Sequence, residues 1–198
     1  MIKNTSDNTA LSSAPVSLSE LLRAAGGESP DKTAIRLGEN LTTFADLEAS
    51  AAAISNLGIA AGERIAVRIG PKDQLIKTLM GIIRSGAIAV PLDRDEPQQQ
   101  KSLLLDCGAA RVIHDGTLTT ATGEFPNVDF LDVADLGSVV AVSPPTLEPE
   151  CACLMLYTSG TLGRRKGVVL SQANLAATVK YMTGFMKLDN SIVEYVGS

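Results

Sequence analysis

The chain has 198 residues, of which 45% are hydrophobic and 20% charged, values typical of an ordinary globular protein rather than a fibrous or disordered one. Its 17 Lys and Arg residues and 22 Asp and Glu residues give a net charge of −5, which argues against a nucleic-acid partner or an anionic membrane surface. No apolar run is long enough to span a membrane and the N-terminus carries no secretory signal pattern, so we expect a cytoplasmic protein.

The first 142 residues predict a tail followed by an α/β subdomain. Residues 1–14 are rich in Ser, Thr and Asn and are expected to be disordered. Over residues 15–142, helix-period segments alternate with short β-branched runs, which predicts a mostly parallel sheet with helices on both faces. The predicted helices are Ser17 to Gly26-Gly27, Thr43–Leu57, Lys72–Ser85 and Pro97 to Gly108. The predicted strands are Thr33–Leu37, Arg64–Ile69, Ala87–Leu92, Arg111–His114, Val128–Leu131 and Ser138–Ala141.

Residues 143–150 contain three prolines and are expected to form an extended linker. The segment 151–198 then begins with Cys151–Tyr157, a continuous apolar run that predicts a strand buried on both faces. A loop, a strand at Val168–Leu170, a helix and the start of another strand at Ser191–Val196 are expected to follow, which makes an incomplete subdomain. An uncovered strand at Ser191–Val196 would favour self-association through this C-terminal edge.

The chemistry is concentrated between the two apolar runs, in the sequence Thr158-Ser159-Gly160-Thr161-Leu162-Gly163-Arg164-Arg165-Lys166-Gly167. The glycines allow successive backbone N–H groups to converge on one point, the hydroxyls add donors, and three consecutive cations supply positive charge. This combination suits a phosphate chain. The pattern matches neither the Walker loop nor the dinucleotide fingerprint, and a basic surface turn joining two strands is the alternative that the residues leave open.

The segment Tyr157–Gly167 resembles the phosphate-binding loop of the adenylate-forming superfamily, which comprises acyl-CoA synthetases, adenylation domains of nonribosomal peptide synthetases, and luciferases. Three further segments resemble the family's motifs in the same order, namely Leu41–Leu47, Arg84–Asp93 and Ser171–Leu175. Two positions depart from the family pattern, because Leu162 stands where a second Thr is usual and Arg165 where Pro is usual. These two departures bear on how efficiently the loop would hold phosphates and not on which family the loop resembles.

The resemblance implies the N-terminal part of an adenylate-forming enzyme, an ATP-dependent carboxylate ligase of the acid–thiol type. Such an enzyme joins a small carboxylic acid to ATP, releases pyrophosphate, and passes the acyl group from acyl-AMP to the thiol of CoA or of a carrier-protein phosphopantetheine. The loop would hold the ATP phosphates together with Mg²⁺. Lys166 is expected to make the main catalytic contact, and the other phosphate-binding residues would be Thr158, Ser159, Gly160, Thr161, Gly163 and Arg164.

Family members are more than twice as long as this chain, and their acid, adenine, ribose and metal sites correspond to segments beyond residue 198. We therefore expect an N-terminal portion that is inactive alone and contributes no metal-ligating residue. The alternative is a non-catalytic interaction module that keeps the fold to bind a partner.

The remaining candidate residues are expected to be structural. His114 lies beside Asp115 but lacks the further partners that acid–base chemistry needs. Cys151 and Cys153 are expected to face one side of a strand and to pack, and residues 93–96 to form a solvated charged loop. Three cysteines and one histidine are too few for a disulfide framework or a zinc site.

Overall fold

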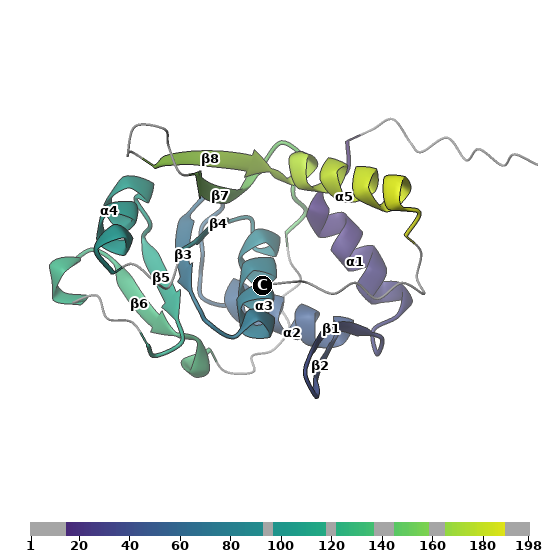
Figure 1. Ribbon diagram of the computed structural model, residues 1–198, viewed down its shortest axis with the longest axis horizontal. Coiled ribbons are helices and arrows are strands. Elements are labelled where there is room, and N and C mark those ends of the chain that lie inside the picture. Colours follow the sequence, from purple (N-terminus) through teal and green to yellow (C-terminus); the bar gives the residue numbers. More distant parts are fainter. Residues whose placement is uncertain (1–14, 93–96, 118–121, 137–144, 159–164, 189–198) are drawn as a thin grey trace, which may run out of the picture.

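The computed structural model describes residues 15–92, 97–117, 122–136, 145–158 and 165–188. Within these residues the main sheet has six strands in the order β6-β5-β3-β4-β7-β8 (Figure 1). They are β3 (Arg64–Arg68), β4 (Ile88–Pro91), β5 (Arg111–His114), β6 (Asp129–Asp132), β7 (Ala152–Thr158) and β8 (Lys166–Ser171). All neighbours are parallel except β7 and β8, so the predicted mostly parallel α/β fold is confirmed.

Five α-helices accompany the sheet in the described ranges: α1 (Leu18–Glu28), α2 (Phe44–Ser55), α3 (Lys72–Arg84), α4 (Pro97–Cys107) and α5 (Gln172–Met186). Two short 3₁₀ helices, η1 (Thr122–Glu124) and η2 (Val133–Asp135), flank β6. Of the helices in the described part of the chain, none is both long enough and apolar enough to cross a membrane.

Capping boxes begin three of these helices. Ser17 and Glu20 cap α1, Thr43 and Asp46 cap α2, and in each pair the backbone N–H of one residue is bound by the side chain of the other. The two starts lie where the sequence predicts them. The predicted end of the first helix is wrong, because α1 continues through Gly26-Gly27 to Glu28.

The predicted strand Thr33–Leu37 forms as β1, but it does not join the parallel sheet. It pairs antiparallel with β2 (Asn40–Thr43), a strand that the sequence reading did not anticipate. Leu37 and Asn40 are register partners, so the connection is a two-residue turn, and Gly38 supplies its positive φ of 58°. The alternation of helices and strands therefore does not predict parallel pairing for this segment.

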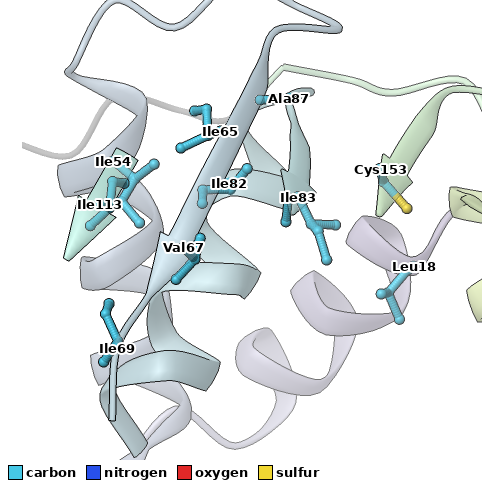
Figure 2. Close-up of a cluster of buried hydrophobic side chains, with 11 residues drawn as sticks. Leu18, Ile54, Ile65, Val67, Ile69, Ile82, Ile83, Ala87, Ile113 and Cys153 are labelled. Atoms are coloured by element: carbon cyan, nitrogen blue, oxygen red, sulfur yellow. The ribbon is translucent and has the colours of Figure 1, made fainter. Parts of the chain in front are cut away.

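The core has two halves, one on each face of the sheet, which confirms helices on both faces. On one face, α2 and α3 pack on β3 and β5 through side chains such as Ile54, Ile65 and Ile82, and Leu18 of α1 lies near Cys153 of β7 (Figure 2). On the other face, Leu103 and Leu104 of α4 pack with Val112 of β5. Each of these side chains is at most 7% exposed. Burying side chains of this size contributes about 1.5–3 kcal/mol each.

Strand β7 differs from its prediction, because it is not buried on both faces. Cys153 and Met155 are buried, whereas Leu156 is 39% exposed. The pairing with β8 shifts register between Ala152 and Leu154, as a β-bulge at Cys153 would produce. The shift places Cys153 in the core half with α1 and Met155 in the half with α4, although the two residues are only two apart.

Burial raises the pKa of the Cys153 thiol to about 11, so the thiol stays protonated and packs as a small apolar group. The predicted strands Ser138–Ala141 and Ser191–Val196 lie outside the described residues. Residues 145–148 have no regular secondary structure and are followed by a turn.

Candidate phosphate-binding site

The strand pair β7 and β8 frames the segment that the sequence singles out. The two strands are antiparallel, with Thr158 opposite Lys166 and Tyr157 opposite Gly167. The predicted strand after the loop is confirmed, so no helix N-terminus follows the loop directly. Any anion held there would depend on backbone N–H groups and on side chains rather than on a helix dipole.

The structure places two of the predicted site residues together. Thr158 and Lys166 are register partners at the open end of the pair, and both are exposed. Directly opposed residues of an antiparallel pair project from the same face, so a hydroxyl and an ammonium group stand side by side where the loop begins and ends. Among the described residues Lys166 forms no ion pair. The other predicted site residues, Ser159, Gly160, Thr161, Gly163 and Arg164, lie outside the described residues.

Tyr157, one residue before this pair, makes a contact that the sequence reading missed. Its hydroxyl donates a hydrogen bond to Asp106 Oδ2 of α4 at 2.6 Å. Partial burial, together with this hydrogen bond to a carboxylate, raises the pKa of Tyr157, so the phenol remains a donor. The sequence does contain a signal for this contact. Asp106 is an acidic residue in the last turn of a helix, where the helix dipole is unfavourable for it, so a favourable contact of its carboxylate is to be expected.

Gly167 leaves room for the opposite strand. A Cβ built there would overlap Cε of Met155 and approach the ring of Tyr157 to 3.4 Å. The glycine therefore allows both side chains to lie across β8 on the face that α4 covers.

Gln172 anchors the far end of β8. Its side chain is fully buried at the first residue of α5. Its Oε1 accepts hydrogen bonds from the backbone N–H and hydroxyl of Ser19 at 3.1 and 3.2 Å, and its Nε2 donates to the carbonyl of Ile83 at 3.0 Å. One side chain thus ties α5 to the start of α1 and the end of α3, and the residue pattern of the motif does not predict these long-range contacts.

The pair His114 and Asp115 holds a turn rather than a catalytic arrangement. His114 Nδ1 accepts from the backbone N–H of Gly116 at 3.0 Å, and Asp115 Oδ2 accepts from the backbone N–H of Gly70 at 2.8 Å. Arg68 lies 3.9 Å from Asp115 and donates to the Thr117 carbonyl at 2.8 Å. These contacts join the ends of β3 and β5, which agrees with the structural role expected for His114.

The arrangement is therefore a helix-flanked, mostly parallel α/β sheet with a loop-bearing strand pair, the architecture of the N-terminal subdomains of adenylate-forming enzymes. The sequence profile of the family described as AMP-binding enzyme matches residues 22–195. The chain belongs to this AMP-binding enzyme family.

Individual relatives agree with this assignment. Fumosorinone synthetase of Cordyceps fumosorosea is 30% identical over 192 residues, which cover 90% of this chain and 5% of that protein. The N-terminal subdomain of Klebsiella oxytoca NpsA, in complex with 3-hydroxyanthranilyl-AMSN, is 20% identical with a TM-score of 0.71 and covers 80% of this chain. The o-succinylbenzoate CoA synthetase of Bacillus subtilis is 18% identical with a TM-score of 0.75 and covers 85% of this chain.

The chain spans only part of each of these relatives. The match covers 42% of the NpsA structure and 36% of the CoA synthetase structure. At these identities the two structures share the fold with this chain.

Proposed function

We propose that the chain is the ATP-phosphate-binding part of a ligase that converts a carboxylic acid and ATP into acyl-adenylate and pyrophosphate, and then transfers the acyl group to a thiol. The acceptor would be CoA or a carrier-protein phosphopantetheine, as the resemblance of the sequence motifs implies. In this proposal the protein acts in the cytoplasm.

The observation that carries the proposal is the register of the strand pair. Thr158 and Lys166 are opposed on one face at the open end of β7 and β8, and in this proposal the Lys166 ammonium and the Thr158 hydroxyl would contact the same ligand. Developing negative charge on a departing pyrophosphate is stabilised by donors and cations held in place beforehand. Ser159, Gly160, Thr161, Gly163 and Arg164 would complete the contacts to the phosphates.

The described residues of the candidate site, Thr158 and Lys166, are better suited to bind a nucleotide phosphate than to coordinate a metal ion. A hydroxyl and an ammonium group donate to phosphate oxygens, whereas magnesium takes oxygen ligands. In the described ranges no group of three or more His, Cys, Asp or Glu side chains is placed to hold a metal ion. Magnesium would enter with the phosphates and neutralise part of their charge.

The test compares Lys166→Ala with the unaltered sequence in a polypeptide that contains the whole enzyme. Loss of one preorganised charge contact should lower acid-dependent pyrophosphate exchange by about 10- to 1000-fold while leaving folding intact. Lys187→Ala, which removes an exposed lysine next to the end of α5, is the matched control and should leave the rate unchanged. An unchanged rate in Lys166→Ala would contradict the role given to Lys166.

A non-catalytic interaction module is the second candidate. It is favoured by the exposed apolar side chains of α5, which include Tyr181 and Phe185 at 70% and 76% exposure. A chain of this kind would bind a protein partner and would leave Mg-ATP unbound. Direct titration with Mg-ATP therefore separates the two candidates.

A further inference from the structure

The end of β7 and β8 that carries the loop lies beyond the position where β7 pairs with β4. Leu154 is the residue of β7 that is in register with β4, opposite Ala89, and Tyr157 follows three residues later. Figure 1 shows β7 and β8 lying across the top of the sheet, with the start of β8 on the side of α4. Beyond Leu154, in the described residues, β7 and β8 pair with each other, and Met155 and Tyr157 carry the contacts of this end with the core half that contains α4.

Tyr157 supplies a connection at this point. Its side chain lies on the face covered by α4, packed against that half of the core, and its hydroxyl reaches Asp106 Oδ2 at 2.6 Å. Gly167 on the opposite strand leaves space for the ring. The hydrogen bond therefore joins the last turn of α4 to a residue adjacent to Thr158.

Asp106 occupies a position that helix energetics alone would not favour. It is the penultimate residue of α4, where the helix dipole presents partial negative charge. Arg64 offsets this charge, since its Nη1 donates to the carbonyl of Cys107 at 2.8 Å. A carboxylate kept at a helix C-terminus, beside an arginine and bound to a tyrosine hydroxyl, is better explained by the contact it makes than by the stability of α4.

We propose that Tyr157 and Asp106 are positioning residues for the pair Thr158 and Lys166, because they hold the end of β7 at a fixed place on α4. The inference builds on the proposed function, because it assigns a support to the same phosphate site. Side chains carried on a fixed strand end lose less conformational freedom when a ligand binds, so the Thr158 hydroxyl and the Lys166 ammonium would be preorganised. Neither Tyr157 nor Asp106 touches the nucleotide in this proposal.

The experiment measures the Kd for Mg-ATP of the 198-residue chain by NMR titration. Tyr157→Phe removes only the hydroxyl, Asp106→Ala removes the acceptor, and Asp106→Asn retains an amide oxygen that accepts. Tyr181→Phe is the matched control, because Tyr181 is 70% exposed on α5 and stacks on Phe185.

Tyr157→Phe and Asp106→Ala should each raise the Kd by about 3- to 10-fold, as loss of one hydrogen bond to a charged group does. The double variant should be no weaker than either single variant, since both remove the same contact. Asp106→Asn should bind within about 2-fold of the unaltered chain, and Tyr181→Phe should bind equally well.

The outcomes separate this inference from the proposed function. If the unaltered chain binds Mg-ATP and the two single variants bind equally well, the positioning role is wrong while the proposed function stands. Additive effects in the double variant would also contradict it, because they would mean two independent contributions. If the unaltered chain binds no Mg-ATP, the proposed function fails and this inference fails with it. A thermal unfolding curve of each variant establishes that the measured Kd belongs to folded protein.

Discussion

At the scale of single residues, side chains of β7 pack closely against a glycine of β8 beside the predicted loop. Gly167 lies opposite Tyr157, and Met155 occupies the position where a Cβ of residue 167 would stand. The glycine in the family-like motif therefore has a packing reason on the strand, in addition to any freedom it gives to the loop.

Gly167→Ala should destabilise the chain by about 1 kcal/mol, because the flexible end of Met155 must move within a packed region and the loss of a strand glycine offsets only part of that cost. Gly184→Ala is the control, since Gly184 lies in α5 and a Cβ built there meets nothing within 4 Å. That substitution should be neutral or stabilising by up to about 1 kcal/mol. Urea unfolding measures both variants. Equal stability of Gly167→Ala and the unaltered chain would show that Met155 adapts without cost.

Residue types predicted a class of ligand for the loop, whereas contacts between distant residues could not be predicted from the sequence. The hydroxyl, glycine and cation pattern predicted the phosphate loop, and Thr158 and Lys166 do stand together. The Tyr157 contact with Asp106 and the buried hydrogen bonds of Gln172 join segments 51 and 153 residues apart. Such contacts depend on how helices and strands pack, which periodicity does not encode.

At the scale of helices and strands, the three capping boxes differ in one useful respect. The backbone N–H of Ser17 donates to Glu20 and that of Thr43 donates to Asp46, whereas that of Ser171 donates to the uncharged amide oxygen of Asn174. Hydrogen bonds from the N-cap residues lower the pKa of Glu20 and of Asp46.

These lowered pKa values predict acid sensitivity for α1 and α2 but not for α5. The stabilisation is complete above the ordinary carboxyl pKa values, about 4.3 for Glu and about 3.9 for Asp, and is lost as the pH falls through the lowered values. The amide signals of Ser17 and Thr43 should shift below about pH 4, while that of Ser171 stays constant. NMR spectra over a pH series measure this. A parallel shift at all three residues would contradict the assignment to the two carboxylates.

Residues close together in the sequence predicted where most helices and strands begin. The predictions that failed are those that depend on which strands pair with each other. Capping residues and the glycines after α3 and α4, which have positive φ values of 84° and 61°, gave helix ends to within about two residues. The hairpin of β1 and β2 and the register shift near Cys153 were missed. Both depend on which strand lies alongside, and this information is not local.

At the scale of the whole molecule, apolar surface gathers on one side of the described structure. Val168 and Val169 of β8 are 44% and 47% exposed, and β8 is an edge strand among the described strands. On α5, Tyr181 and Phe185 stack with their ring centroids 6.0 Å apart. Val179, Met182 and Met186 of α5 are also 43–48% exposed, so the helix presents a wide apolar surface of the kind that is usually covered in a folded protein.

The 198-residue chain should therefore self-associate through α5 and β8, together with the predicted strand at Ser191–Val196. Phe185→Glu should shift the population toward monomer, because it places a charge in the exposed apolar surface. Leu41→Glu is the control, since Leu41 is 50% exposed on β2 within the separate hairpin. Light scattering at several concentrations measures the mass. A compact monomer at high concentration, with strong amide protection of residues 192–196, would contradict the prediction.

The central claim is that the segment between β7 and β8 binds the phosphates of ATP, and an NMR titration of the chain with Mg-ATP tests it most directly. The account predicts saturable shifts of the Thr158, Arg165 and Gly167 amide signals, with a Kd on the order of millimolar, because the phosphates are the only part of the nucleotide that these residues hold. Mg-pyrophosphate should shift the same signals, adenosine should not, and Lys166→Ala should weaken both phosphate ligands. No shift at these amides, or equal shifts with adenosine alone, would contradict the account.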